Sequence, residues 1–310
     1  HEFGHYVSHN AVGYNGGQFG TNQYGLSPHS GSIDEGIADY FACSENGDPV
    51  LGETLVALGA SRNLEDTSKT CPDDVIGEVH ADGEIVGSLG WTLRQNYGKA
   101  VGDRLVWGAV SLMPNTGSLA DFARGLQAVA DALGEEGTLS PAQRATIDAF
   151  IAERGIDQCD HVVPLVGSEP RRTTLIGLDV VGQLFGAPCA QLQAFGIEVQ
   201  SIFHFSGQPP VGAESVTFQV DLTPLGGGSL DYRLLVRKDE HIRFSAGGAG
   251  LPAPGASDYE QTSTTRELSL VIDAASDPPF DPDATYYAVL MSANCPVAQV
   301  DIAMLPGGSS

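Results

Sequence analysis

Apolar residues recur every three or four positions through the first half of the chain, as they do on the buried face of a helix. The segments 83–95 and 118–133 follow this spacing. A third helix is expected from Ser140 to Arg154, because an N-cap serine, a proline at the first helical position and a capping-box glutamine open it and a glycine follows it. Residues 1–160 are therefore expected to form a mainly helical domain.

The pattern changes after residue 160 to short runs with strand character, which glycine, proline and aspartate separate. Several strands at this spacing are typical of an antiparallel β-sandwich. The fold class is thus expected to be multidomain α and β, with a linker at 161–172, a β-sandwich at 173–305 and a flexible tail at 306–310. The predicted strands are 197–205, 215–222, 231–237, 267–272, 285–291 and 297–304.

Composition and charge narrow the classes of partner. Of the 310 residues 42% are hydrophobic and 17% charged, which is typical of a folded protein. Lysine and arginine number 15 against 39 aspartates and glutamates, giving a formal net charge of −24, whereas nucleic-acid binding needs a basic face. No apolar run reaches the roughly 18 residues that cross a membrane. The sequence therefore predicts no nucleic-acid partner and no membrane span, and leaves the oligomeric state open.

The chain opens with the pattern His-Glu-x-x-His at residues 1–5, a candidate metal motif. On a helix, His1 and His5 lie four residues apart on one face, so both imidazoles can bind one metal ion. Glu2 would project beside them, where it can accept a proton from water that the metal activates. The further histidine that would make a metzincin is absent from the sequence. His9 is interpreted as a solvated histidine or one that supports the ligands, so a third ligand is still needed.

Glu35 is the best candidate for that third ligand. It lies in the segment 31–41, Gly-Ser-Ile-Asp-Glu-Gly-Ile-Ala-Asp-Tyr-Phe, where Asp39 shares its helical face. Asp39 would accept the second ring N–H of a ligating histidine, and Asp34 is expected in a similar supporting role. A solvated acidic helix face is the alternative. Apolar residues on both sides of Glu35 argue for burial, and buried acids need a partner such as a metal ion.

A third motif, at residues 77–85, contains His80 at the expected start of a helix. The three ordered motifs resemble those of the gluzincin zinc metallopeptidases of the thermolysin and fungalysin families. The patterns Glu-Gly-x-x-Asp-x-Phe and Val-His-x-x-Gly-Glu are closer to fungalysin. The resemblance covers about residues 1–157 and implies a thermolysin-like lobe with Zn²⁺ as cofactor. The residues that match the family machinery are the zinc ligands His1, His5 and Glu35, the general base Glu2 and His80, which stabilises the tetrahedral intermediate.

Other family features match less closely. The loop between the second and third ligands is longer than usual, and the substrate-binding tyrosine could be Tyr14 or Tyr24. Arg62 matches an arginine that holds a substrate carbonyl, with a surface arginine as the alternative. Further acidic residues could serve two other roles: Asp73 or Asp74 orienting His80, and Glu45, Asp48 and Glu53 binding Ca²⁺.

Five cysteines without a Cys-x-x-Cys pair exclude a zinc ribbon and are typical of disulfides in an exported protein. We expect Cys43 to pair with Cys71, which would join the helix that carries Glu35 to the loop before His80. The odd cysteine is expected to have its partner upstream of the sequence. The remaining three are Cys159, Cys189 and Cys295.

Together these features predict a secreted zinc-dependent endopeptidase that hydrolyses protein or peptide substrates. A zinc aminopeptidase and a binding or adhesion protein with an inactive peptidase lobe are the alternatives. The strand region is similar to bacterial pre-peptidase C-terminal domains, which implies an accessory role in targeting or substrate binding. Because the sequence begins within the active-site motif, an upstream β-rich lobe and an export signal are expected, and residues 1–310 alone are expected to bind zinc weakly and cleave little.

Overall fold

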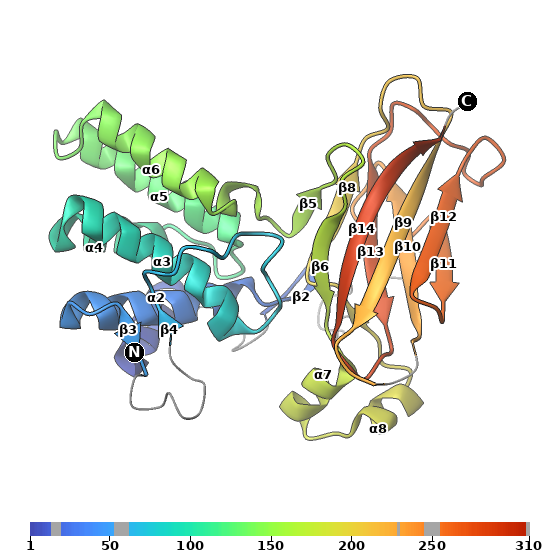
Figure 1. Cartoon of the computed structure of the whole chain (residues 1–310), viewed down its shortest axis with the longest axis horizontal. Coiled ribbons are helices and arrows are strands. Elements are labelled where there is room, and N and C mark those ends of the chain that lie inside the picture. The colour runs from blue at the N-terminus through green and yellow to red at the C-terminus, as the bar shows by residue number, and fades with distance from the viewer. Residues whose placement is uncertain (14–19, 53–61, 228–229, 245–254, 308–310) are drawn as a thin grey trace. The chain divides into compact units, whose positions relative to one another are not determined.

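The chain divides into two compact units, seen in the computed structural model of Figure 1. The structure describes residues 1–13, 20–52, 62–227, 230–244 and 255–307. The first unit comprises residues 1–20 and 28–160, and the second comprises residues 21–27 and 161–310. A short segment between the first two helices therefore belongs to the second unit.

The first unit is helical, as its apolar spacing predicts. A short two-stranded sheet, β3 (Val50–Leu51) with β4 (Arg62–Asn63), and a single 3-10 turn at Ile156–Gln158 complete it. Its helices are α1 (Glu2–Val12), α2 (His29–Asn46), α3 (Val79–Tyr97), α4 (Lys99–Ser111), α5 (Leu119–Glu135) and α6 (Pro141–Glu153).

The three helices expected from apolar spacing and capping residues are confirmed. Helix α5 begins at a capping box in which the Ser118 hydroxyl and the Asp121 carboxylate bond reciprocally to the backbone. Ser140 and Gln143 do the same for α6, which ends as expected where Gly155 takes a left-handed conformation. Helix α4 was not predicted as a separate element.

The second unit is built around two large sheets, and the hairpin of β1 (Gly20–Asn22) and β2 (Gly25–Ser27) accompanies them. In the six-stranded sheet the strand order is β11-β10-β13-β8-β5, with β7 pairing with β13, and in the four-stranded sheet it is β12-β9-β14-β6. Every pair is antiparallel except β5 with β8. The strands are β5 (Val162–Pro164), β6 (Arg171–Leu175), β7 (Val199–Gln200), β8 (His204–Gly207), β9 (Ser215–Pro224), β10 (Tyr232–Lys238), β11 (Tyr259–Ser263), β12 (Glu267–Ile272), β13 (Tyr286–Ser292) and β14 (Ala298–Gly307).

The two sheets pack together through apolar side chains. Strand β9 alternates strictly, with Val216, Phe218, Val220 and Leu222 fully buried between exposed or half-buried neighbours. Gly207 on β8 lies so close to Met304 on β14 that an added methyl group would meet its sulfur at 2.8 Å. The expected combination of α and antiparallel β structure is therefore confirmed.

Several boundaries of the second unit differ from expectation. Residues 161–172, expected as a linker, contain β5 and the start of β6, and β14 continues into the expected tail as far as Gly307. The single strand expected at 197–205 is two strands, β7 and β8. Two short helices, α7 (Leu178–Phe185) and α8 (Cys189–Ala194), and the strand β11 were not predicted.

The expected disulfide between Cys43 and Cys71 is wrong. Cys71 pairs with Cys159 within the first unit, and Cys189 pairs with Cys295 within the second. Cys43 carries a free thiol that is 1% exposed and packs among the side chains of Leu64 and Trp91. It behaves as a small apolar core residue, because burial raises the pKa of its thiol to about 12.

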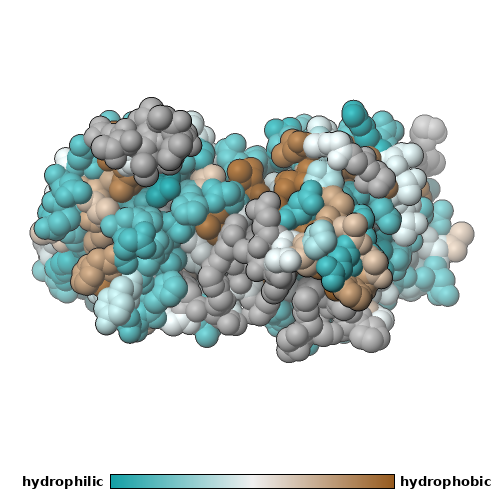
Figure 2. All heavy atoms as spheres, turned by 90° about the horizontal axis from the view of Figure 1, so that it is seen from below, coloured by the Kyte–Doolittle hydropathy of each residue, from teal (hydrophilic) through white to brown (hydrophobic). Residues whose placement is uncertain are grey.

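Hydrophilic residues predominate on the face shown in Figure 2, and hydrophobic residues form small patches on it. This agrees with the large excess of acidic side chains in the sequence. Among the described helices, none combines the length and the apolar character that a bilayer crossing needs.

Candidate metal centre

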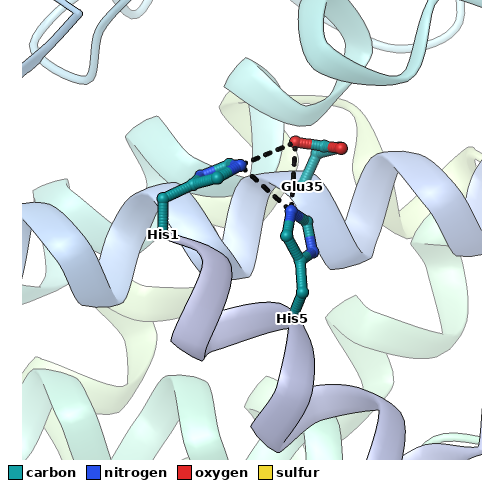
Figure 3. A group of neighbouring side chains, drawn as sticks. All are labelled: His1, His5 and Glu35. Atoms are coloured by element: carbon teal, nitrogen blue, oxygen red, sulfur yellow. Dashed lines mark hydrogen bonds and ion pairs between the residues drawn. The ribbon is translucent and has the colours of Figure 1, made fainter.

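Helices α1 and α2 bring the three expected ligands together, as Figure 3 shows. His1 Nε2 lies 3.0 Å from His5 Nε2. Oε2 of Glu35 lies 3.4 Å from His1 Nε2 and 3.6 Å from His5 Nε2. The three atoms thus form a nearly equilateral triangle.

The size of this triangle suits zinc. A tetrahedral zinc ion with bonds of roughly 2.0–2.1 Å holds its ligand atoms about 3.3–3.4 Å apart. The three measured separations, 3.0, 3.4 and 3.6 Å, lie around that value. Three protein ligands also leave a fourth position open, as a catalytic zinc site requires.

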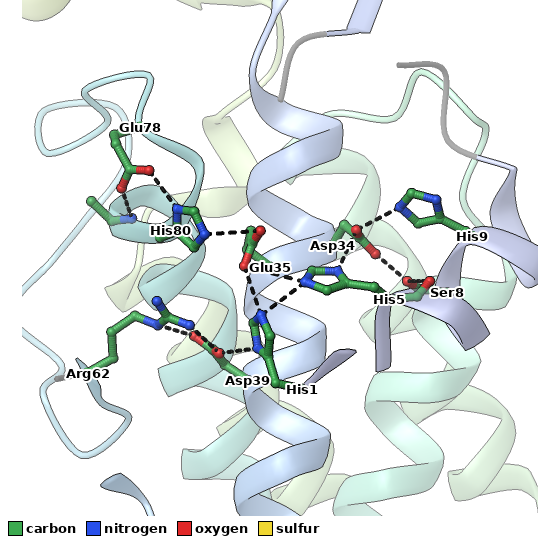
Figure 4. A network of polar contacts seen from close by, with 11 residues as sticks. His1, His5, Ser8, His9, Asp34, Glu35, Asp39, Arg62, Glu78 and His80 are labelled. Atoms are coloured by element: carbon green, nitrogen blue, oxygen red, sulfur yellow. Dashed lines mark hydrogen bonds and ion pairs between the residues drawn. The ribbon is translucent and has the colours of Figure 1, made fainter. Parts of the chain in front are cut away.

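Carboxylates on the far side of the two imidazole rings indicate which ring nitrogens face the triangle. His1 Nδ1 lies 2.7 Å from Asp39 Oδ1, and His5 Nδ1 lies 2.7 Å from Asp34 Oδ2 (Figure 4). Since a carboxylate accepts hydrogen bonds, each Nδ1 carries the proton and each Nε2 presents a lone pair. Two lone pairs and a carboxylate oxygen that converge on one point repel each other unless a cation lies between them.

The acidic neighbours of His1 favour a proton on its ring. Hydrogen bonds to Asp39 and Glu35 outweigh partial burial and raise the pKa of His1 to about 9. Burial alone would raise the pKa of Glu35, but the hydrogen bond with His1 and the charges of nearby histidines lower it. The electrostatics of the site therefore favour positive charge at this point.

Asp34 supports more than one group. Besides His5, its carboxylate accepts hydrogen bonds from the Ser8 hydroxyl and from His9 Nε2, the latter at 2.8 Å. His9 thus helps to hold the carboxylate beside His5, although 51% of its own side chain is exposed. Asp34 itself is buried. Three donors on one carboxylate hold it in place behind the His5 ring.

The Arg62 guanidinium pairs with the Asp39 carboxylate. Its Nε and one terminal nitrogen lie 2.6 and 2.7 Å from the two carboxylate oxygens of Asp39. Burial would raise the pKa of Asp39, but the hydrogen bonds from His1 and Arg62 hold it below its usual value. Arg62 thus holds the carboxylate that lies beside His1. Its expected role in holding a substrate carbonyl stays a prediction.

His80 lies in the first turn of α3, as expected, and contacts the second carboxylate oxygen of Glu35. Its Nε2 lies 3.3 Å from Glu35 Oε1, and its Nδ1 lies 2.7 Å from Glu78 Oε1. Glu78 also caps α3, because its other oxygen accepts the Ala81 backbone N–H. The residue that orients His80 is thus Glu78, which the sequence analysis missed.

The two aspartates proposed for orienting His80 do not do so. Asp74 accepts hydrogen bonds from the backbone and hydroxyl of Thr70. Asp73 has no described contact with His80. The signal that could have found Glu78 is its position as N-cap, one residue before the helix and two before the histidine.

The remaining expected site residues are placed as follows. Glu2 is the first residue of α1 and is exposed, and within the described part of the chain it has no hydrogen bond or ion pair. Tyr24 lies in the segment that belongs to the second unit, and its ring contacts three histidines there. Tyr14 lies outside the described residues.

Two of the acidic residues considered for calcium binding have other partners. Glu45 forms an ion pair with Lys99 at 3.1 Å, and Asp48 Oδ1 accepts the Val50 backbone N–H. Glu53 lies outside the described residues. Calcium binding stays a prediction from the sequence.

Comparison with known proteins adds no identification. No protein-family model matches the chain, and no curated protein matches it. One solved structure with some likeness is a family GH115 4-O-methyl-α-glucuronidase with specificity for decorated arabinogalactans. It is 12% identical with a TM-score of 0.20, and the match covers 75% of this chain and 30% of that one. A likeness this low carries no argument about function.

Proposed function

We propose that this chain carries the zinc site of a secreted endopeptidase of the gluzincin type, with a thermolysin-like helical lobe. One observation carries the proposal, namely the triangle of His1 Nε2, His5 Nε2 and Glu35 Oε2 with edges of 3.0–3.6 Å. Two carboxylates behind the histidines point both lone pairs at its centre. The two disulfides are in keeping with an oxidising, extracellular setting.

The side chains around the triangle suit hydrolysis of a peptide bond. Bound there, Zn²⁺ would supply Lewis acidity, which lowers the pKa of water toward ~7 and polarises a carbonyl group. Glu2 is exposed beside His1, so its carboxylate can take up a proton and pass it to the leaving amine. His80 is held through Nδ1 by the Glu78 carboxylate, and in its imidazolium form it can also donate from Nε2 to a carbonyl oxygen as negative charge develops on it.

Metal analysis of matched variants tests the proposal. Glu35→Gln should abolish stoichiometric zinc binding, because the amide cannot supply the anionic ligand, whereas Glu45→Gln on the same helix should leave zinc binding unchanged. Glu2→Gln should retain zinc and lose nearly all chelator-sensitive hydrolysis of casein. Full zinc retention in Glu35→Gln, or casein cleavage that persists in Glu2→Gln, would contradict the assignment.

A further inference from the structure

The third motif of the first unit contains a buried acid that has no part in the chemistry described so far. Asp82 lies in the first turn of α3 and is 0% exposed. Its two carboxylate oxygens accept the backbone N–H groups of Ile76 and Gly77, each at 2.8 Å. The carboxylate therefore holds the loop that enters α3 against the first turn of the same helix.

These hydrogen bonds fix the main chain of the residue that orients His80. Gly77 directly precedes Glu78, and the Glu78 carbonyl oxygen accepts the Asp82 backbone N–H at 2.9 Å. The main chain of Glu78 is thus tied to Asp82 on both sides. One Glu78 carboxylate oxygen lies 2.7 Å from His80 Nδ1, and the other accepts the Ala81 N–H at 2.9 Å (Figure 4). The place of the carboxylate beside the imidazole therefore depends on the contacts of Asp82.

Helix α3 itself is held by other contacts. A methyl group on Gly83 would lie 2.9 Å from the Ser32 carbonyl oxygen, so the first turn of α3 lies directly against α2. The Lys69 ammonium group donates to the Ala81 carbonyl oxygen at 3.0 Å. Weakening the hydrogen bonds of Asp82 should therefore leave the helix in place and move the loop, which shifts Glu78 relative to the His80 ring.

The charge of Asp82 costs stability. Burial raises the pKa of its carboxyl to about 7 against the two backbone hydrogen bonds, while the charge of Glu78 adds to the rise and that of Lys69 opposes it. Because the folded chain binds this proton more tightly than the unfolded chain, its contribution to stability is lost as the pH rises through 7. A buried charge retained at such a cost is typical of a functional position.

We propose that Asp82 is a positioning residue for His80 and acts on it through the loop at 76–77 and Glu78. The inference rests on the proposed function for the part that His80 plays in hydrolysis. With the loop in place, the Glu78 carboxylate keeps a proton on His80 Nδ1, and Nε2 stays directed at the metal centre, 3.3 Å from Glu35 Oε1. Without it the ring loses its acceptor, while the zinc ligands on α1 and α2 are untouched.

Asp82→Asn in the full-length chain tests this inference. The amide keeps the shape of the side chain but sets an NH₂ group against one of the two backbone donors. We expect zinc content to stay at the wild-type level and turnover of casein to fall about tenfold or more, the scale at which supporting residues act on metal sites. Two-bond ¹⁵N–¹H spectra should show that the protonation of the His80 ring nitrogens has changed.

The matched control is Asp121→Asn. Asp121 also lies in the first turn of a helix, α5, and its carboxylate accepts the Ser118 backbone N–H at 2.9 Å. This variant should lose stability and keep the wild-type His80 spectrum and turnover. Near-UV circular dichroism checks folding. If Asp82→Asn does not fold, Asp82→Ser decides the question, because a hydroxyl can accept one N–H without presenting an NH₂ group to the other.

Failure of this inference can be told apart from failure of the proposed function. If the wild-type chain binds no zinc and cleaves no casein, the proposed function fails, and the His80 spectrum of the Asp82 variant still decides whether Asp82 positions the ring. An unchanged His80 spectrum, or an equal change in Asp121→Asn, would overturn the role of Asp82. In an active wild-type background, full turnover in a variant with a changed spectrum would overturn it as well.

Discussion

Asp34 and Asp39 each lie beside one histidine of the proposed metal centre, but the two carboxylates are stabilised differently. Asp39 is buried and shares its charge with Arg62, so the charge of the carboxylate behind His1 is compensated by a guanidinium. Within the described part of the chain Asp34 has no guanidinium partner, and it accepts hydrogen bonds from Ser8 and His9. The first arrangement depends on an ion pair and the second on hydrogen bonds, so they should respond differently to substitution.

Replacing Arg62 with methionine should therefore destabilise the first unit. The Asp39 side chain is 1% exposed and would retain a buried charge without its cation, which costs about 2–4 kcal/mol. Chemical denaturation measures the change in the free energy of unfolding. His9→Gln, which alters the partly exposed donor to Asp34, is the control and should cost less than about 1 kcal/mol. If both variants lowered the free energy of unfolding by an equally small amount, the ion pair with Arg62 would not be what stabilises Asp39.

Substitution of Glu78 should slow catalysis without removing zinc. In Glu78→Gln the His80 ring loses its carboxylate acceptor, and we expect turnover to fall by about tenfold or more while zinc content stays at the wild-type level. The matched control is Asp74→Asn, which should leave turnover unchanged because Asp74 bonds to Thr70. Steady-state peptidase kinetics and metal analysis give both readouts. If turnover instead fell in Asp74→Asn and not in Glu78→Gln, Asp74 would be the residue that orients His80.

Contacts between residues that are close in the sequence could be predicted, whereas contacts between distant segments could not. His1 and His5, like Glu35 and Asp39, are four residues apart on one helix, so their shared faces follow from helical periodicity alone. The contact of Glu78 with His80 depends on the N-cap conformation, which requires the helix start to be known to within one residue. The Arg62 contact joins a short strand to a helix and has no local sequence signal.

At the scale of elements, glycines let the three helices of the site come close together. Gly36 on α2 and Gly83 on α3 face each other, and a methyl group on Gly83 would lie 2.9 Å from the Ser32 carbonyl oxygen and 3.1 Å from Glu35 Cβ. Gly4 on α1 faces Ala38 on α2 in the same way. Small residues at both crossings thus set the distances between the helices that carry the ligands and His80.

Gly4→Ala should push α1 away from α2. The new methyl group would lie 2.8 Å from Ala38 Cα, a backbone atom that cannot move independently, so the ligand triangle should open and zinc affinity fall about tenfold or more. Gly134→Ala on α5 is the control, because the atoms nearest to its methyl group would belong to the flexible Arg144 side chain and not to the backbone. That control should gain up to about 1 kcal/mol from helix propensity. Chelator competition and thermal unfolding measure the two effects.

Elements with local signals were predictable, and those defined by distant partners were not. Ser140 and Gln143 specify the start of α6 by themselves. Strand β5 is three residues long and exists because it pairs with β8, about 40 residues away in the sequence, which no local pattern indicates. The disulfide error has the same origin, since Cys71 meets Cys159 across 88 residues.

At the scale of the whole molecule, the eight histidines fall into two groups with different chemistry. Five lie in the first unit, where carboxylates stabilise the charged form of His1 and raise its pKa. Three lie in the second unit around Tyr24, where burial favours the neutral form of His204 and His241. Mild acid should therefore affect the second unit through its histidines while the proton on His1 remains in place.

His204 makes this a quantitative prediction. Burial, together with the neighbouring His161 and His241, lowers its pKa from 6.5 to about 3, although a hydrogen bond to the Tyr24 carbonyl opposes the shift. At pH values between about 3 and 6.5, His204 binds a proton in the unfolded chain but not in the folded unit. Its contribution to stability is therefore complete above pH 6.5 and is lost as the pH falls toward 3, by up to about 1.4 kcal/mol per pH unit.

Hydrogen exchange of β8 between pH 7 and pH 5 measures this loss, because carboxylates titrate mainly below that window. After correction for intrinsic exchange rates, protection in the wild-type chain should fall by up to tenfold per pH unit. His204→Gln keeps an N–H donor for the Tyr24 carbonyl but cannot titrate, so its protection should be nearly constant with pH. An equal pH dependence in both proteins would mean that a group other than His204 is responsible for the loss of protection. Since Tyr24 lies in the hairpin, the same loss of protection should extend to the backbone that His204 holds.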